Sequence, residues 1–545
     1  MQKELKQAVV QACNRLFSVE IDPVITRPEK QFGDYATNVA LQLAGQTGKN
    51  PRQIAEQLAA ELQQIPAVAQ ISLAGPGFIN FKLTDESLAE AAQSATDLPK
   101  PLKGRQILVE FGDPNPFKEM HIGHLYSYIV GDAIASLLES SGAKVKRLSY
   151  HGDVGLHVAK AIYGLGELQT RDEDILGKAY SYGNEQYEKD QQAKAEIDTI
   201  NQHIYSRDDQ RINQLHEQGI KLSFEYFDKI LNMLSISTDK RYFESQTTPA
   251  GLELVNSNKD KVFKLSQGAV VYEGEKAGLH TRVFITSKGL PTYETKDLGL
   301  VMLKDTDYPD ANRSIVITAS EQAEYFKVML AALAEIKPDL TVKTTHLSHG
   351  FLSLASGKMS SRTGNVYTAM AMLNSVRSAM AKKYPDSADR QEIYVAATKY
   401  SMLNHRLGQD IVIDVEASVS LEGNSGPYLQ YAFARANSIL EKSTVDSRQS
   451  TANDSRLTTL DSSERSFARK IGEYPEVVER AVAELMPHHI CTYLYELAQT
   501  FNGFYEKSRI IGDEREEIRL KLVKSYSQVL RSGLSILSIE APERM

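Results

Sequence analysis

A strand, a helix and a second strand are predicted between residues 106 and 149. The run Gln106-Ile-Leu-Val-Glu-Phe111 is apolar enough for a buried strand, and residues 144–149 form a second such run. Between them, apolar side chains recur at every fourth position: Leu125, Ile129, Ala133 and Leu137. This spacing predicts a helix, which Gly142 would end. Two strands joined by a helix form a βαβ unit, which implies a parallel sheet.

Polar residues follow each predicted strand of this sheet. A third strand is predicted at 314–318, again before a polar loop and a helix. In open α/β sheets, ligands bind beyond the carboxyl ends of the strands. The residues expected to gather at that edge are Glu110, His121, His124, Asp153 and Gln322.

The chain is too long for one hydrophobic core. At 545 residues, the usual domain size predicts three or four units. We expect a small α/β module at 1–97, a Rossmann-like parallel-sheet domain at 98–380 and an all-helical domain at 381–545, with a proline-containing linker after the first. A polar, charge-dense stretch at about 165–290 is interpreted as a helical insertion into the sheet domain.

Composition excludes several classes of protein. The only cysteines, Cys13 and Cys491, are far apart, which argues against a disulfide framework or a cysteine-based zinc site. No run of about 18 apolar residues is present, so we expect no membrane span and a cytoplasmic protein. The net charge of −8 argues against general coating of nucleic acid but leaves room for a local basic groove.

The stretch His121-Ile-Gly-His124, with Lys118 just before it, has three interpretations. A metal site would need a third ligand at suitable spacing, and no nearby residue supplies one. The two histidines could instead cap and pack the start of a helix. The third possibility is a cradle for a polyphosphate, because a helix N-terminus offers free N–H groups to anions and Gly123 allows close approach to the backbone.

A second candidate site is the loop Ser356-Gly-Lys-Met-Ser-Ser-Arg-Thr-Gly-Asn365. Its cationic side chains, hydroxyls and glycines suit a phosphate clamp, although a solvated basic turn would have the same composition. The two stretches are more specific together than either is alone.

Both stretches resemble the two signature motifs of class I aminoacyl-tRNA synthetases. The segment Glu110-Phe-Gly-Asp-Pro-Asn-Pro-Phe-Lys-Glu-Met-His121 is similar to the corresponding part of arginyl-tRNA synthetases, as is Tyr293-Glu-Thr-Lys-Asp297. Further similar motifs lie at 33–35 and 75–80 in the N-terminal module, at 426–435, and at the C-terminus, 541–545. The resemblance runs nearly from end to end of the chain.

The resemblance implies a role for each motif residue. ATP is expected at His121, Gly123, His124, Lys358, Met359 and Ser360. Arginine is expected at Glu110, Asn115, His124, Tyr293, Asp297 and Gln322. Residues expected to contact tRNA are Phe32, Tyr35, Asn80, Tyr428, Tyr431, Arg435 and Met545. Catalysis is assigned to Lys118, His121, His124 and Lys358, with Mg²⁺ bound to ATP and no dedicated metal site.

The chemistry of the side chains agrees with an arginine substrate. A guanidinium pairs best with carboxylates, because its fixed donors match their two oxygens. Tyr293 and Asp297 are four residues apart in a helical pattern and so share a face, and Glu110 ends the first strand. A glutamyl-tRNA synthetase would share both signatures but needs cations at these positions. The other alternative is a tRNA-binding relative without catalysis, which is disfavoured because the histidines and lysines are retained.

Four positions depart from the family pattern. Ser361 stands where many class I enzymes have a catalytic lysine, and Lys118 is similar to the lysine that many arginyl enzymes carry instead before the first signature. Tyr325 and Phe433 replace frequent histidines, and Val154 replaces a common aromatic residue.

The predicted C-terminal helix at 426–435 carries an aromatic stripe. Tyr428, Tyr431 and Arg435 are spaced for one helix face, where two rings and a cation could stack on unpaired anticodon bases. A stripe of this kind is also typical of a helix core, and the motif match decides for the tRNA interpretation. The expected enzyme is a monomer that uses L-arginine, ATP and tRNA(Arg), with an N-terminal tRNA-binding module and a C-terminal anticodon-binding domain.

Overall fold

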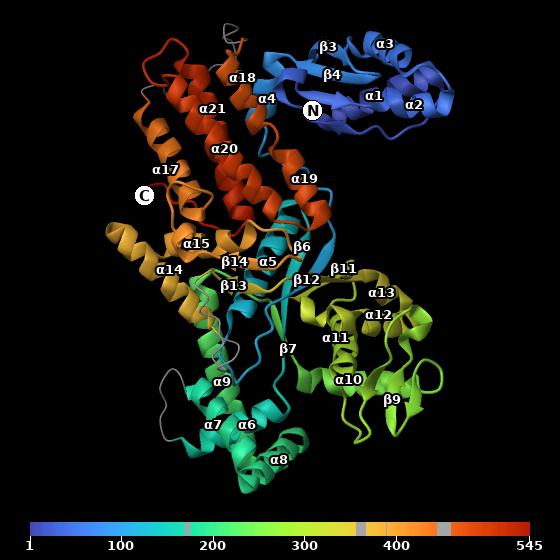
Figure 1. Ribbon diagram of the computed structural model, residues 1–545, viewed down its shortest axis with the longest axis vertical. Helices are drawn as coiled ribbons and strands as arrows, with labels where there is room; N and C mark the ends of the chain where they lie inside the picture. The colour runs from blue at the N-terminus through green and yellow to red at the C-terminus, as the bar shows by residue number, and fades with distance from the viewer. Residues whose placement is uncertain (169–174, 356–366, 388–389, 444–458) are drawn as a thin grey trace.

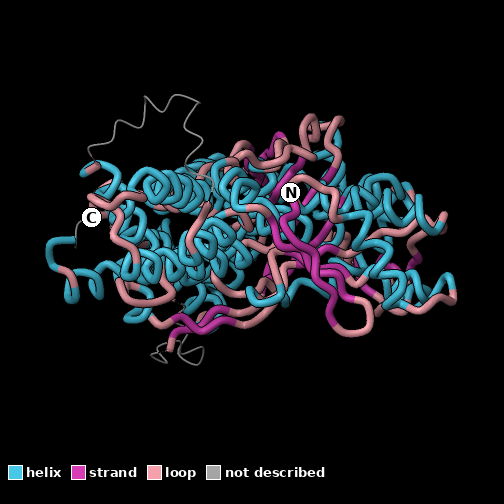
Figure 2. Tube along the Cα trace, turned by 90° about the horizontal axis from the view of Figure 1, so that it is seen from above, coloured by secondary structure: helices cyan, strands magenta, loops and turns pink. Residues whose placement is uncertain are grey.

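The computed structural model describes residues 1–168, 175–355, 367–387, 390–443 and 459–545 (Figure 1). Helices make up most of the chain, and strands lie in short groups among them (Figure 2). No helix in the described part of the chain is both long and apolar enough to cross a membrane.

The predicted parallel sheet is present and has five strands in the order β12-β11-β5-β6-β7. They are β5 (Gln106–Glu110), β6 (Lys144–His151), β7 (Lys240–Phe243), β11 (Arg313–Ala319) and β12 (Thr344–His349), and every neighbouring pair is parallel. Helix α5 (Ile122–Ser140) joins β5 to β6, which confirms the βαβ unit. Because α5 packs against both the sheet and the C-terminal helices, most of its residues are buried. The carboxyl ends of β5, β6, β11 and β12 therefore share one edge, where the ligand site was expected.

The stretch expected to be one helical insertion at about 165–290 is interrupted by the sheet. Its first part contains the helices α6 (Leu156–Glu167), α7 (Ile175–Lys189), α8 (Gln191–Ser206) and α9 (Gln210–Met233). Strand β7 then pairs with β6, so this part of the prediction is wrong. The strand reads Lys-Arg-Tyr-Phe, and a short charged edge strand has no apolar run that a sequence pattern could reveal.

A second group of elements lies between β7 and β12. It contains α10 (Glu244–Ser257), the three-stranded sheet β8 (Lys264–Ser266), β9 (Ala269–Tyr272) and β10 (Arg282–Ile285), then α11 (Tyr293–Asp307), α12 (Ala323–Ile336) and α13 (Pro338–Lys343). Helices α10 and α11 pack tightly, because a side-chain carbon at Gly251 or Gly299 would meet backbone oxygens of the facing helix about 2.0 Å away. This packing places the start of α11 beside the sheet edge.

Among its described residues, the C-terminal part is helical except for one short strand. Its helices are α14 (Ala369–Lys383), α15 (Gln391–Leu403), α16 (Val415–Ser418), α17 (Gly426–Lys442), α18 (Ser462–Ile471), α19 (Tyr474–Glu484), α20 (His488–Lys507) and α21 (Glu516–Ile536). The exception, β14 (Ile411–Ile413), pairs with β13 (Leu352–Leu354) and so ties this part to the end of the sheet domain.

The N-terminal module is an antiparallel sheet with helices, as expected of a small α/β unit. Its strands β1 (Ile25–Thr26), β2 (Tyr35–Thr37), β3 (Val68–Ala74) and β4 (Phe78–Leu83) have the order β1-β2-β4-β3, and its helices are α1 (Gln2–Phe17), α2 (Val39–Thr47), α3 (Pro51–Leu62) and α4 (Asp85–Gln93). The module lies beside α18 and α19, at the opposite end of the molecule from α6–α9 (Figure 1). Ion pairs Arg27–Glu476 (2.8 Å) and Arg465–Asp34 (2.5 Å) join the two parts.

Candidate active site

The paired histidines lie at the start of α5, and His121 caps the helix. Its Nδ1 accepts hydrogen bonds from the backbone N–H groups of Gly123 (3.1 Å) and His124 (3.3 Å). The two imidazole rings stack with centroids 3.5 Å apart. A side-chain carbon at Gly123 would lie 2.9 Å from the His121 ring, so a larger residue here would displace that ring. The capping interpretation is therefore correct for His121, and it also fixes the proton on Nε2, which is free to donate to a ligand.

The imidazoles at this edge are neutral near pH 7. Burial lowers the pKa of His121 to about 4, with further lowering by the charges of Lys118 and His349. Burial also holds the pKa of His124 well below its usual range. Neutral imidazoles serve as N–H donors, whereas Lys118 brings a positive charge.

Side-chain hydrogen bonds tie the loop after β5 to the end of β6 and to the residue that follows it. The Asn115 Oδ1 accepts from the Gly152 N–H (3.1 Å), and the Asp113 Oδ1 accepts from the Tyr150 N–H (2.7 Å). The His151 Nδ1–H donates to the Pro114 carbonyl (2.8 Å). The loop that carries Asn115 and Lys118 is thus fixed against the sheet.

Two buried carboxylates, Glu110 and Asp297, face this edge from β5 and α11. Glu110 forms an ion pair with Lys304 of α11, and Asp297 accepts a hydrogen bond from the Tyr325 hydroxyl (2.8 Å). The pKa of Asp297 is raised to about 8, chiefly by burial and also by the charges of Glu110 and Glu244, while Tyr325 and Lys304 oppose the rise. Glu110 is thus close enough to Asp297 for its charge to influence the pKa of that carboxyl.

Tyr293 and Asp297 share one helix but differ in exposure. Tyr293, the first residue of α11, is 65% exposed, whereas Asp297 is 7% exposed one turn later. Gln322, at the end of the short 3-10 helix Ser320–Gln322 after β11, is exposed as well. Tyr293 and Gln322 are therefore open to solvent, whereas Asp297 is buried.

Three charged or polar groups that sequence patterns did not reveal lie at the same edge. Glu244, the first residue of α10 directly after β7, forms a buried ion pair with Lys296 (2.5 Å), and its carboxylate lies near Gly152. His157 donates from Nε2 to the Gly152 carbonyl (3.0 Å), and burial lowers its pKa to about 4. Glu244 was missed because the strand before it was missed, and His157 directly follows the loop at 151–155, which could have signalled it.

Four residues of the second candidate loop lie outside the described residues: Lys358, Met359, Ser360 and Ser361. Within the described ranges, no group of three His, Cys, Asp or Glu side chains could hold a metal ion.

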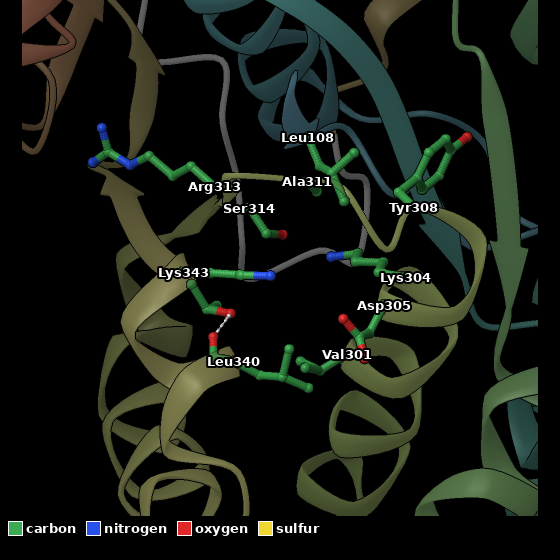
Figure 3. A pocket seen from close by; sticks show the side chains of 11 residues that line it. Leu108, Val301, Lys304, Asp305, Tyr308, Ala311, Arg313, Ser314, Leu340 and Lys343 are labelled. Carbon is green, nitrogen blue, oxygen red and sulfur yellow. Dashed lines mark hydrogen bonds between the residues drawn. The ribbon is translucent and has the colours of Figure 1, made fainter. Parts of the chain in front are cut away.

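A small cavity lies at the other edge of the sheet, where β11 and β12 begin. It measures about 30 Å³ and is lined by residues that include Leu108, Val301, Lys304, Arg313, Leu340 and Lys343 (Figure 3). A cavity of this size has room for only about two or three water molecules, so it is too small for a substrate.

The N-terminal module brings together two of its three predicted tRNA contacts. Phe32, which is 46% exposed, and Asn80 line a cavity of about 440 Å³ together with Phe78. Tyr35, by contrast, is 1% exposed, and its hydroxyl donates to Glu476 of α19 (2.6 Å). Tyr35 therefore belongs to the joint between the module and the C-terminal helices.

The aromatic stripe on α17 divides between core and surface. Tyr431 is 44% exposed, but Tyr428 is 9% exposed, contacts Tyr495 edge to face and accepts a hydrogen bond from Asn502 (3.0 Å). Tyr428 thus packs against α20, whereas Tyr431 is open to solvent. Arg435 lies over the ring of Tyr505, 4.4 Å from its centroid.

The remaining predicted residues on this side are Met545, which is exposed, and Phe433, which is fully buried. Val154, the other departure from the family pattern, is also buried and packs among the apolar residues of α6–α9.

A parallel sheet whose first strand leads into a helix that begins His-Ile-Gly-His is the arrangement of the catalytic domain of class I aminoacyl-tRNA synthetases. Three family models match successive parts of the chain. They are the arginyl tRNA synthetase N terminal domain at 3–83, the catalytic domain of class I (R) tRNA synthetases at 88–406 and the DALR anticodon binding domain at 429–545. The chain therefore belongs to the arginyl-tRNA synthetase family.

Comparison with individual proteins points to the same family. The chain is 31% identical to an arginine–tRNA ligase of Limosilactobacillus reuteri and 30% identical to one of Lactobacillus delbrueckii subsp. bulgaricus, with 100% of this chain and 99% and 100% of the relatives covered. Among solved structures, the Thermus thermophilus arginyl-tRNA synthetase superposes with a TM-score of 0.84 at 26% identity over 100% of both chains. The Plasmodium falciparum arginyl-tRNA synthetase shares the fold, with a TM-score of 0.82 at 21% identity over 100% of this chain and 99% of that one.

Proposed function

We propose how this arginine–tRNA ligase divides its reaction among its residues. Two buried carboxylates at the same edge of the sheet as a pair of neutral, stacked histidines carry the proposal, because that combination suits a guanidinium on one side and a triphosphate on the other. Glutamate, the substrate of the alternative class I enzyme, would be repelled by Glu110 and Asp297.

Asp297 and Glu110 bind the arginine side chain. The carboxylate of Asp297 pairs with the guanidinium, and Tyr325 orients it by donating to Oδ2. Lys304 holds one oxygen of Glu110, which leaves the other side of that carboxylate for the substrate. Asn115, Tyr293, Gln322 and His124 complete the pocket around the amino-acid backbone.

The first reaction step needs no general base. The arginine carboxylate attacks the α-phosphate of Mg-ATP, a new P–O bond forms, and the bond to the bridging oxygen breaks as pyrophosphate leaves. Catalysis then depends on position and on stabilising phosphate charge. His121 and His124 donate N–H groups, Gly123 allows close approach, and Lys118 supplies a positive charge, with Lys358, Met359 and Ser360 assigned by motif alone.

In the second step, the arginyl group moves from the adenylate to the terminal adenosine of tRNA(Arg), and AMP leaves. Exposed Tyr431, with Arg435 and Met545 nearby in the C-terminal domain, supplies the contact with anticodon bases, and Phe32 and Asn80 supply a second contact through the N-terminal cavity. Domains at 1–97, 98–380 and 381–545, a monomeric state and a cytoplasmic location complete the proposal.

An aminoacylation panel tests the assignment. Purified protein is incubated with Mg-ATP, total tRNA and each standard amino acid in turn, and acid-precipitable product is counted. Only arginine should be charged, and Asp297→Asn should abolish most of the charging at low arginine concentration. Charging of another amino acid would overturn the proposal, and so would full activity of the Asp297→Asn variant.

A further inference from the structure

We propose that Tyr180 of α7 is a positioning residue for Lys118, whose ammonium its ring holds beside the paired histidines. The Lys118 Nζ lies over the Tyr180 ring, 4.5 Å from the centroid. Both side chains are partly buried, so water screens this cation–π contact less than it would at the surface. The proposal rests on the catalytic role assigned to Lys118 above.

The backbone on the tyrosine side of the contact is fixed. Helices α6 and α7 approach each other so closely that a side-chain carbon at Gly164 would lie 2.1 Å from the Ala179 carbonyl oxygen. One turn later, a side-chain carbon at Gly183 would lie 1.9 Å from the Lys160 carbonyl oxygen. Tyr180 stands between these two points of close approach, so the backbone that carries its ring is held in place.

The backbone on the lysine side is fixed as well, by another helix of the same group. Phe117 is fully buried, and its N–H donates to the Ser223 Oγ of α9 (2.8 Å). Its ring fills the space that a side chain at Gly219 would occupy, since a carbon added there would lie 1.9 Å from it. Met120, on the other side of Lys118, is also fully buried.

With both backbones fixed, the remaining freedom is that of the flexible lysine side chain. The charge of Lys118 lowers the pKa of His121 and of His157, so the ammonium is within electrostatic range of both imidazoles. The ring of Tyr180 therefore holds the ammonium in a working position. In this way the helices α6–α9 act on the phosphate chemistry without contacting the nucleotide.

The test compares Tyr180→Leu with Tyr180→Phe in single-turnover adenylate formation, measured with arginine, Mg-ATP and tRNA. A cation–π contact of about 0.5–2 kcal/mol corresponds to a rate loss of about twofold to thirtyfold for Tyr180→Leu. The KM values for ATP and arginine should change little, because the contact matters where charge grows on the phosphates. Tyr180→Phe keeps the ring and should retain most of the rate.

The matched control is Tyr187→Leu on the same helix. The Tyr187 ring also lies under a lysine, 4.2 Å from the Lys160 Nζ, but this pair does not adjoin the histidines. Tyr187→Leu should leave the rate of adenylate formation unchanged. An equal loss in both leucine variants would attribute the effect to the stability of α7 and overturn the proposal.

A double variant separates this proposal from the role of Lys118 itself. If Tyr180 acts through the ammonium, Tyr180→Leu should have no further effect in a Lys118→Ala background. Additive losses would overturn the inference, as would a faster Tyr180→Leu enzyme. If Lys118→Ala alone keeps the parental rate, the assigned role of Lys118 fails, and the positioning role fails with it. A slow Lys118→Ala enzyme beside an unaffected Tyr180→Leu enzyme rejects the positioning role alone.

Discussion

The proposed substrate pocket and the proposed tRNA-facing surfaces differ in how exposed their motif residues are. At the sheet edge, the proposed arginine-binding carboxylates Glu110 and Asp297 are both buried. In the tRNA-facing motifs, Tyr35 and Tyr428 serve packing, while their neighbours Phe32 and Tyr431 are exposed. A carboxylate that is buried at a sheet edge can still bind a charged ligand, because electrostatic interactions are strong at short range where the dielectric constant is low. A base can stack only on a ring that is exposed.

The largest expected effect lies in the pocket. Lys118→Ala removes a preorganised charge and should slow adenylate formation by about a hundredfold or more, equivalent to about 3–4 kcal/mol. The KM values for ATP and arginine should change far less, because the charge meets phosphate oxygens only as the reaction proceeds. Single-turnover kinetics measure the rate.

Two further variants sharpen the interpretation of Lys118. Lys118→Arg should retain part of the rate, and Lys118→Gln should resemble alanine, since charge is the property that matters. Adding Ser361→Lys to Lys118→Ala should recover some activity if both positions address the same phosphates. A parental rate in Lys118→Ala would show that the lysine is only a solvated loop charge.

The second effect is the pH dependence of arginine binding. The pKa of Asp297 is about 8, raised first by burial, and only the ionised carboxylate pairs with a guanidinium. Affinity should therefore fall as pH drops below 8 and level off above it, with a difference of about twenty-five-fold between about pH 6.5 and about pH 8.5. His121 and His157, with pKa values of about 4, do not titrate in this range.

Isothermal titration calorimetry of arginine over this pH range measures the affinity and the proton released on binding. Glu110, Asp113, Glu244, Lys304 and Tyr325 surround Asp297 and set its pKa, so Lys304→Met should move the midpoint to higher pH. Asp297→Asn should give weak binding that is independent of pH. A flat profile in the parental enzyme would mean that Asp297 is already ionised at pH 6.5 or does not contact the substrate.

Sequence patterns predicted the frame of the pocket well, because its parts are local. The βαβ unit, the histidines at the start of α5 and the placement of Glu110 at the end of β5 follow from short-range periodicity. The residues that pair with the carboxylates of Glu110 and Asp297 could not be predicted from short-range periodicity. Lys304 reaches Glu110 because α11 packs near the end of β5. The sequence marks Tyr325 only as a departure from the family pattern, and the hydrogen bond from its hydroxyl to Asp297 is visible only in the structure.

The tRNA side shows the limit of periodicity. A spacing of three residues places Tyr428 and Tyr431 near one another on α17, yet the neighbouring α20 covers only the first. Which part of a helix face is covered depends on tertiary contacts, which the spacing of one helix does not contain.

The third effect concerns the exposed ring on α17. Tyr431→Ala should weaken tRNA binding by about 1–3 kcal/mol if an anticodon base stacks on it. The KM for arginine should stay unchanged, because α17 is not part of the pocket. Filter binding with tRNA(Arg) at a fixed salt concentration measures the affinity, and unchanged binding in a folded variant would leave Tyr431 without a role in recognition.

The smallest effect separates packing from recognition within the same helix. Tyr428→Phe removes only the hydroxyl that accepts from Asn502, and this should lower the free energy of unfolding by about 0.5–1.5 kcal/mol. The dissociation constant for tRNA should not change, because the ring is covered by Tyr495 and cannot stack on a base. Tyr431→Phe is the matched control, since an exposed hydroxyl is replaced by water and its loss should leave stability unaltered. Urea unfolding and filter binding of both variants make the comparison. Weaker tRNA binding by Tyr428→Phe at unchanged stability would place Tyr428 on the recognition surface. The contrast between the proposed substrate pocket and the proposed tRNA-facing surfaces would then no longer hold.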